Sequence, residues 1–138
     1  MSLSLHSTIE LTGVPIKAQI GIFTVDEPDL YEHMLDLTLE ISPRLVLIQS
    51  DGMAQVFDYD PLLEHIHRVS QDRHYETQEM LASRIVQSCA MFEEILGVEV
   101  CLNKFRSNGA GGTVCGTIGV RLSVTDQDLI RVRALNLG

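Results

Sequence analysis

The residue with the clearest chemical potential is Lys104, which ends an apolar run and precedes a glycine-rich segment. A lysine amine in this setting can bind a phosphate, transfer protons or extend to solvent at a strand end. A phosphate-binding loop is excluded by its spacing: Gly111 and Gly116 are correctly separated, but Thr117 follows where a lysine is required. A dinucleotide-binding turn is excluded as well, because Val114 takes the place of its third glycine.

The alternation around Lys104 predicts where its amine points. Lys104 is in step with the apolar residues Val98, Val100 and Leu102. A regular strand therefore directs the amine toward the covered face of a sheet. Burial disfavours the ammonium and favours the neutral amine, the form that accepts a proton. Two interpretations stay open, a proton-transferring amine and a strand-end lysine that extends to water.

The cysteines and the helix histidines do not indicate a metal site. Cys89, Cys101 and Cys115 are odd in number and lack CxxC spacing, so we interpret them as free thiols. His65 and His67 are two residues apart on a predicted helix and do not share a face. We expect no bound metal.

Length and composition indicate one globular domain. Of 138 residues, 45% are hydrophobic, which is sufficient for a core, and we expect a single domain over residues 1–138 with its core at about 8–125. The 19 acidic and 10 basic residues give a net charge of −9, which argues against nucleic acid or an anionic membrane as partner. The first residues lack the pattern of a signal peptide, so we expect a cytoplasmic protein.

Local periodicity predicts the elements that must position Lys104. Period-two alternation predicts a strand over residues 35–41, with its hairpin partner within residues 9–22, and two further strands over residues 98–104 and 118–124. These four strands form a hairpin at each end of the chain.

Two amphipathic helices are predicted between the hairpins. The first begins at Pro61 with Asp60 as its N-cap, and the second extends from Leu81 to Leu96, where Gly97 ends it. The order β-β-α-α-β-β predicts an α+β domain, a four-stranded antiparallel sheet with two helices on one face. The tail after Gln127 is expected to be loose.

Several segments in this order resemble one known family. The chain is similar, from about residue 9 to residue 124, to the dihydroneopterin aldolases and their dihydroneopterin-triphosphate epimerase relatives, which have the tunnelling fold. The segments are IGIFTVDE (20–27), LDLTLEI (35–41), SDGMAQVFDY (50–59), QEMLASRI (78–85) and VEVCLNK (98–104).

The resemblance implies a role for individual residues. Glu79 matches the family's pterin-anchoring glutamate, since one carboxylate can accept parallel hydrogen bonds from the 2-amino and N3–H groups of the ring. Lys104 matches the catalytic lysine, and Tyr59 matches a tyrosine that reaches the site from a neighbouring subunit. Gln78 and Asp58, beside these residues, are expected to contact substrate.

The chain also departs from the family pattern. The family's loop glutamate falls on Asp26, which is one methylene shorter, and the adjacent Glu27 is the alternative carboxylate. Tyr31 replaces a frequent glutamine, and Phe105 replaces the usual proline after the lysine. Substrate and reaction within the family therefore stay open.

The implied activity is metal-free retro-aldol cleavage of the C1′–C2′ bond of 7,8-dihydroneopterin in folate biosynthesis. The products are 6-hydroxymethyl-7,8-dihydropterin and glycolaldehyde. No cofactor or lysine Schiff base is implied, because the dihydropterin imine accepts the electrons; Lys104 would act on a water or hydroxyl, and Tyr59 would protonate the intermediate. The alternatives are epimerase or oxygenase activity, or a pterin-binding paralogue without catalysis.

The resemblance also implies a homo-oligomer, a tetrameric ring or an octamer of two stacked rings, with active sites at the subunit interfaces. His33 and His74 lie near the segments that map to the site. Each has two interpretations, a pocket-lining residue and a histidine without a functional role.

Overall fold

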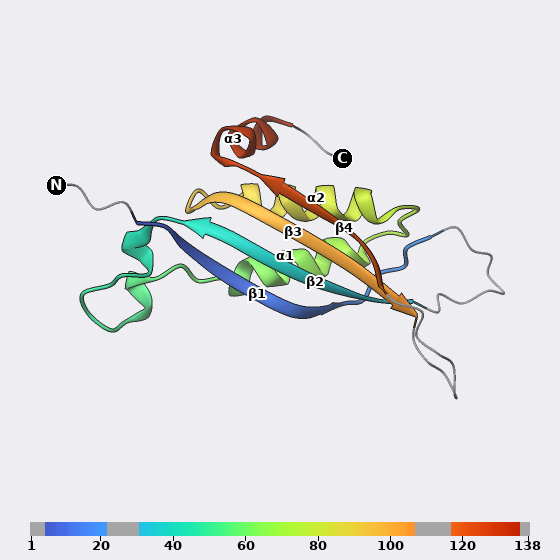
Figure 1. The fold of residues 1–138 in the computed structure, drawn as a ribbon, viewed down its shortest axis with the longest axis horizontal. Coiled ribbons are helices and arrows are strands. Elements are labelled where there is room, and N and C mark those ends of the chain that lie inside the picture. The colour runs from blue at the N-terminus through green and yellow to red at the C-terminus, as the bar shows by residue number, and fades with distance from the viewer. Residues whose placement is uncertain (1–4, 22–30, 107–116, 136–138) are drawn as a thin grey trace.

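The computed structural model describes residues 5–21, 31–106 and 117–135, with the backbone alone at residues 31, 105, 106 and 117 (Figure 1). In chain order the elements are β1 (Ser7–Ile16), β2 (Tyr31–Ile41), the short 3-10 turns η1 (Pro43–Leu45) and η2 (Met53–Gln55), α1 (Asp60–Gln71), α2 (Gln78–Ala90), β3 (Ile95–Arg106), β4 (Thr117–Val124) and α3 (Asp126–Ala134). The predicted order of strands and helices is confirmed, and α3 follows it. The four strands form one antiparallel sheet with the order β1-β2-β3-β4.

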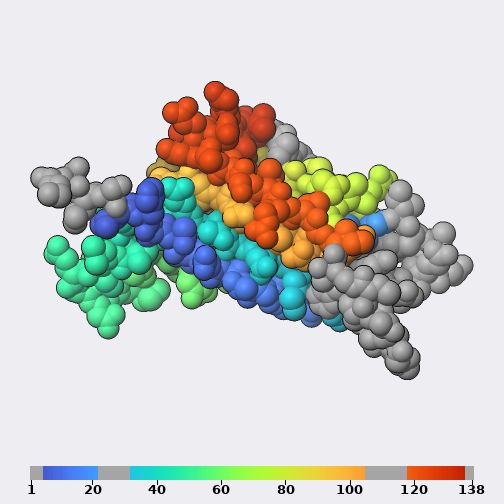
Figure 2. Space-filling view, in the orientation of Figure 1, coloured from blue at the N-terminus to red at the C-terminus, as the bar shows by residue number. Residues whose placement is uncertain are grey.

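Alternation along the strands separates the two faces of the sheet. Leu35, Leu37 and Leu39 of β2 are at most 1% exposed and belong to the core under the helices. Asp36 and Thr38, which lie between them, are on the opposite face. This second face is formed by the strands themselves, with α1 and α2 behind them (Figures 1 and 2).

A bulge interrupts the first hairpin. The register of β1 against β2 shifts between Leu11 and Val14. Gly13 adopts a φ of 69°, a conformation that favours glycine, and its N–H donates to the Asp36 carboxylate over 2.7 Å. Two residues of β1 stand opposite one residue of β2 at this point, the arrangement of a β-bulge.

Helices α1 and α2 run in opposite directions across the same face of the sheet (Figure 1). Helix α1 begins one residue earlier than predicted: Asp60 is its first residue, and Tyr59 takes the N-cap position without a side-chain hydrogen bond. Helix α2 has a conventional N-cap, since the Thr77 hydroxyl accepts a hydrogen bond from the Met80 N–H at 3.2 Å.

The prediction for the end of the second helix is wrong, because α2 ends at Ala90 and Leu96 belongs to β3. Phe92 and Leu96 happen to continue the helical spacing, but a turn separates them from the helix. Gly97 lies at a close approach of strands: a Cβ there would lie 3.0 Å from Glu40 Oε2 and 3.3 Å from the Val124 carbonyl oxygen, which leaves little room for a side chain.

The expectation of a loose tail is wrong for residues 126–134, which form α3. Leu129 is 0% exposed and joins the core. Arg133 donates hydrogen bonds to the carbonyl oxygens of Ala90, Phe92 and Ile95 over 2.6, 3.1 and 3.0 Å. These contacts come from residues distant in sequence, so the local pattern could not indicate them.

Strand β4 is less covered than its alternation predicts. Val124 is 8% exposed, but Ile118 is 66% and Leu122 is 41% exposed. Both pair with helix-facing residues of β3, so they lie on the helix side of the sheet, at an edge that α1 and α2 of the same chain leave open to solvent. An edge strand with uncovered apolar residues is suited to pairing with another chain.

The described cysteines are free thiols, as predicted. Cys89 and Cys101 are buried, and Cys115 lies outside the described residues. Burial raises the pKa of Cys89 to about 12. Its thiol therefore stays protonated at neutral pH and contributes to packing.

Candidate functional site

Lys104 lies near the end of β3 and is half-buried. It pairs with His33 on β2 and with Ile118 on β4. The alternation of β3 places it on the same face as Val100 and Leu102, both 0% exposed. Strand β3 is regular at this point, with no shift of register from Val98 to Phe105, which is the condition on which the predicted direction of the side chain rests.

The N-terminus of α2 lies against this end of β3. Gln78 is 7% exposed, and its Nε2 is 3.5 Å from the carbonyl oxygens of Leu102 and Ile118. The next residue, Glu79, is exposed in the first turn of α2. The structure therefore brings Gln78, Glu79 and Lys104 to one end of the molecule, with Gln78 facing the sheet and Glu79 facing solvent.

The segment after β1 is held beside the same helix end. The backbone N–H of Tyr75 donates to the Gln19 carbonyl, and the N–H of Gly21 donates to the Tyr75 carbonyl, each over 2.8 Å. The His74 ring is hydrogen-bonded to the Gly21 carbonyl. Two predicted carboxylates, Asp26 and Glu27, follow this segment and lie outside the described residues.

Tyr75 anchors the link between the two helices. Its side chain is 2% exposed, and its hydroxyl donates to the Val69 carbonyl at 2.6 Å and accepts a hydrogen bond from Arg84. Arg84 also donates to both carboxylate oxygens of Asp72, over 2.7 and 2.8 Å. These contacts fix the turn that delivers the first residues of α2 to the end of β3.

The ionisation of this cluster follows from its contacts. Hydrogen bonds from the Arg84 guanidinium lower the pKa of Asp72. The hydrogen bonds of Arg84 to Asp72, and to a lesser extent to Tyr75, raise the pKa of Arg84. Burial raises the pKa of the Tyr75 phenol. At neutral pH the link therefore contains a carboxylate, a guanidinium and a neutral phenol.

Tyr59 and Asp58 lie at the other end of the helix pair. They precede α1, which runs antiparallel to α2 for 12 residues, a length of about 18 Å. Tyr59 is 42% exposed, and the Asp58 carboxylate accepts a hydrogen bond from the Asp60 N–H at 3.1 Å. Within a single chain, Tyr59 and Asp58 therefore lie at the opposite end of the helix pair from Glu79 and Lys104.

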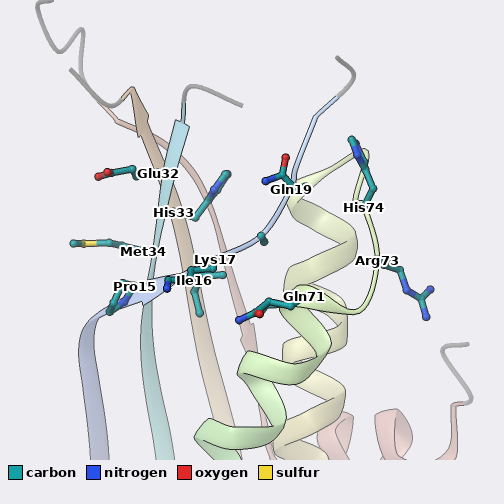
Figure 3. A pocket seen from close by; sticks show the side chains of 12 residues that line it. Pro15, Ile16, Lys17, Gln19, Glu32, His33, Met34, Gln71, Arg73 and His74 are labelled. Atoms are coloured by element: carbon teal, nitrogen blue, oxygen red, sulfur yellow. The ribbon is translucent and has the colours of Figure 1, made fainter. Parts of the chain in front are cut away.

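A pocket of about 670 Å³ opens between the end of β1, the start of β2 and the α1–α2 link (Figure 3). It is lined by Pro15, Ile16, Lys17, Ala18, Gln19, Glu32, His33, Met34, Ser70, Gln71, Arg73 and His74. His33 is 3% exposed. Its ring extends to the same side as Gln19, whereas Glu32 and Met34 extend from the strand in the opposite direction (Figure 3).

Both His33 and His74 line this pocket, and the described residues that line it do not include Lys104 or Glu79, so a role for either histidine in the mapped site stays a prediction. The sequence contains a signal for His33, since it is in step with Leu35 and Leu37 and so belongs to the buried face of β2. Its pairing with Lys104 required the register of the sheet.

Among residues 5–21, 31–106 and 117–135, no cluster of three His, Cys, Asp or Glu side chains is arranged to hold a metal ion. No helix in this part of the chain combines the length and apolar character needed to cross a bilayer.

Comparison with known proteins gives a consistent result. The family model for dihydroneopterin aldolase (FolB) matches residues 9–123 of the chain. A dihydroneopterin aldolase of Streptomyces coelicolor is 27% identical over 96 residues, which cover 70% of this chain and 80% of that protein.

Two solved structures share the fold. The dihydroneopterin aldolase of Burkholderia thailandensis bound to guanine has a TM-score of 0.65 at 18% identity, covering 87% of this chain and 91% of that one. The Escherichia coli dihydroneopterin aldolase in complex with neopterin has a TM-score of 0.66 at 14% identity, covering 85% and 97%. At these identities the two structures establish the fold, and the predicted fold class is confirmed.

We expect Asp72→Asn to destabilise the protein in a pH-dependent way. The pKa of Asp72 is lowered from 3.8 in the folded state, mainly by hydrogen bonds from Arg84, so its stabilisation is present above that value and is lost as the pH falls through the folded-state pKa. The variant should lose about 1 kcal/mol of unfolding free energy at pH 7, a value reduced for solvent screening, and progressively less below about pH 4. Urea unfolding across this pH range measures the difference.

Glu99→Gln is the matched control. Glu99 is also paired over 2.7 Å, but its partner Arg121 is 66% exposed, so solvent screens the interaction. The variant should be less destabilised than Asp72→Asn at pH 7. Equal effects, or an Asp72→Asn deficit that does not change with pH, would contradict the assignment.

Proposed function

Because the chain belongs to the dihydroneopterin aldolase family, we propose that it cleaves the side chain of 7,8-dihydroneopterin by a retro-aldol reaction. The C1′–C2′ bond breaks, and the products are 6-hydroxymethyl-7,8-dihydropterin and glycolaldehyde. Neither a metal nor a cofactor is part of this proposal, because the imine of the dihydropterin ring can accept the electron pair of the broken bond.

The observation that carries the proposal is that the N-terminus of α2 packs against the end of β3 where Lys104 lies. Gln78 contacts the carbonyls of Leu102 and Ile118, which places the adjacent Glu79 at the end of β3 where Lys104 lies. An amine that faces a covered side and a solvent-facing carboxylate suit two different tasks, proton transfer and ring binding.

Glu79 is assigned to the pterin ring. A 2-amino group and a neighbouring ring N–H form two parallel donors that match one carboxylate. Neopterin and guanine, which are bound by the relatives from Escherichia coli and Burkholderia thailandensis, both present this pair of donors. The exposed first turn of α2 also favours an anionic carboxylate through the helix dipole.

The proton transfers are assigned to Lys104 and Tyr59. Lys104, directly or through a water, takes the proton of the C2′ hydroxyl as C2′ becomes the aldehyde carbon of glycolaldehyde. The bonding electrons move onto the ring and give an enol-like intermediate at C1′. Tyr59 then protonates C1′ and restores the imine, and its own proton is replaced from the Lys104 ammonium, so that no net proton is gained or lost.

Tyr59 must come from a second copy of the chain. Within one chain, α1 alone separates it from the N-terminus of α2 by about 18 Å. Strands β1 and β4 form the two edges of the sheet, and exposed Ile118 and Leu122 lie on β4. We therefore propose a closed ring in which edge strands pair between copies, a tetramer or two stacked tetramers, and in which Tyr59 and Asp58 complete the neighbouring site.

The remaining assignments concern the loop carboxylate and the location of the protein. We assign a supporting carboxylate to Asp26 or Glu27, both outside the described residues. We also propose a cytoplasmic location for the protein.

The direct test is incubation of the protein with 7,8-dihydroneopterin, followed by separation of the pterins and assay of glycolaldehyde. Equal amounts of 6-hydroxymethyl-7,8-dihydropterin and glycolaldehyde are expected. Recovery of only the C2′ epimer would show an epimerase, and binding without any product would show a pterin-binding paralogue. Either result would overturn the proposed function.

Lys104→Ala should lower kcat by about 10²–10⁴-fold, the usual contribution of a positioned acid–base group, with little change in neopterin affinity. Lys104→Arg should not restore turnover, because a guanidinium stays protonated at neutral pH. Steady-state kinetics and calorimetry with neopterin provide the two measurements, and sedimentation confirms that the variants assemble as wild type does. Near wild-type kcat in both variants would remove Lys104 from the mechanism.

Glu79→Gln should weaken neopterin binding by roughly 10–100-fold, because the amide replaces one acceptor with a donor that faces the ring's own donors. Glu64→Gln is the control, an exposed carboxylate on α1 away from the N-terminus of α2. Calorimetric titration with neopterin measures both. If Glu79→Gln and Glu64→Gln bind alike, Glu79 is not the ring anchor.

Mixing two variants tests whether sites are shared. Tyr59→Phe and Glu79→Gln should each turn over poorly as pure proteins. After unfolding and refolding together in equal amounts, about a quarter of the sites should combine an intact Tyr59 with an intact Glu79 from the next copy and regain activity. Activity in the mixture no higher than the mean of the separate variants would show that each site is built within one chain.

A further inference from the structure

His33 is a buried basic side chain beside the lysine assigned to proton transfer. It is 3% exposed and lies directly opposite Lys104 in the register of β2 and β3. Directly opposed residues of antiparallel strands have Cβ atoms about 4.5–5.5 Å apart. The two side chains share one face, because His33 is in step with Leu35 on β2 and Lys104 is in step with Leu102 on β3.

The pairs that follow along the two strands show how unusual this one is. Leu35 pairs with Leu102 and Leu37 with Val100, so the same row of the sheet is entirely apolar until it reaches His33 and Lys104. A histidine that served only to fill the core would need no basic partner. Its ring instead lines the pocket between β1, β2 and the α1–α2 link (Figure 3).

Charged and titratable side chains from several elements line the same pocket as His33. Lys17 comes from the segment after β1, and Arg73 and His74 come from the α1–α2 link, where Arg73 is also paired with Asp72. Glu32, the acidic residue lining the same pocket in the described part of the chain, extends away from His33 (Figure 3). Like charges on adjacent side chains repel, so a protonated His33 imidazole would compete with an ammonium formed on Lys104 during turnover.

We propose that His33 is a positioning residue for Lys104, and this inference rests on the proposed function. The neutral imidazole has one nitrogen that accepts a hydrogen bond, and the Lys104 ammonium is a donor without acceptor capacity. After Lys104 takes the proton of the C2′ hydroxyl, His33 accepts a hydrogen bond from the new ammonium and holds it in the orientation that returns the proton toward Tyr59. His33 does not contact the substrate.

This role predicts how turnover changes with pH. Protonation of His33 removes the acceptor and places a cation next to the amine. The value of kcat should therefore fall on the acidic side of neutrality, in the range where histidine changes charge, while neopterin affinity should not follow the same curve.

Two substitutions separate the titration of His33 from its hydrogen bond. His33→Phe, which keeps a ring but has no acceptor, should lower kcat about 10–100-fold across the pH range with neopterin affinity unchanged. His33→Asn keeps an acceptor that does not titrate, so kcat at pH 8 should stay within about threefold of wild type and the acidic fall should be absent. His67→Asn, on the half-buried side of α1, is the control and should keep the wild-type profile.

An NMR titration of His33 in the absence of substrate tests the His33–Lys104 pairing independently of catalytic turnover. The carbon-bound ring protons of His33, assigned by comparison with His33→Asn, report its titration by NMR in the assembled protein. In Lys104→Met the titration midpoint should rise by at least about half a pH unit, because the Lys104 amine no longer competes with His33 for a proton as the pH falls.

The outcomes distinguish the two proposals. An unchanged midpoint in Lys104→Met, or an acidic fall of kcat that persists in His33→Asn, overturns the role of His33 even when Lys104 proves essential. Full activity of Lys104→Ala, or no cleavage of 7,8-dihydroneopterin by the wild type, overturns the proposed function. A raised midpoint together with loss of the acidic fall supports the role of His33.

Discussion

The short link between α1 and α2 is the constraint on which the site depends. Arg84 on α2 donates to both oxygens of Asp72 and to the hydroxyl of the buried Tyr75, so the helix is tied to the chain that enters it. Tyr75 also joins its backbone to Gln19 and Gly21. A single turn thereby holds the segment after β1 and the N-terminus of α2 at the same end of the sheet. Only 12% of the Arg84 side chain is exposed, and a guanidinium so far withdrawn from water is costly to leave unpaired, so this geometry is strongly specified.

The tight link has a consequence for the active site. It forces α1 and α2 to run antiparallel, so residues before α1 and residues at the start of α2 lie at opposite ends of the helix layer (Figure 1). Tyr59 and Glu79 cannot serve one site within a chain unless α1 is disrupted. The same sheet leaves β1 and β4 as edges, with apolar residues uncovered on β4. Both features are accommodated by the proposed ring of several copies, in which Tyr59 reaches the neighbouring site and edge strands pair between copies.

The sheet contributes the other half of the site through its register. The alternation that buries Leu35 and Leu102 also turns His33 and Lys104 inward where the strands end. The same period-two alternation therefore buries apolar side chains along most of this row and places two basic side chains, His33 and Lys104, at its end. Because the helices cover this face, His33 is 3% exposed and Lys104 is half-buried.

Local patterns in the sequence determined the order of the elements and the direction of Lys104, because periods of 2 and 3.6 residues depend only on neighbours along the chain. The same patterns misplaced the end of α2, since Phe92 continued the spacing by chance, and they missed α3, which Arg133 holds to carbonyl groups distant in sequence. Only the tertiary structure decided that His33 faces Lys104 and that Tyr59 lies far from the start of α2. Strand register and the meeting of helix ends arise from contacts between residues far apart in the chain, which no local period can specify.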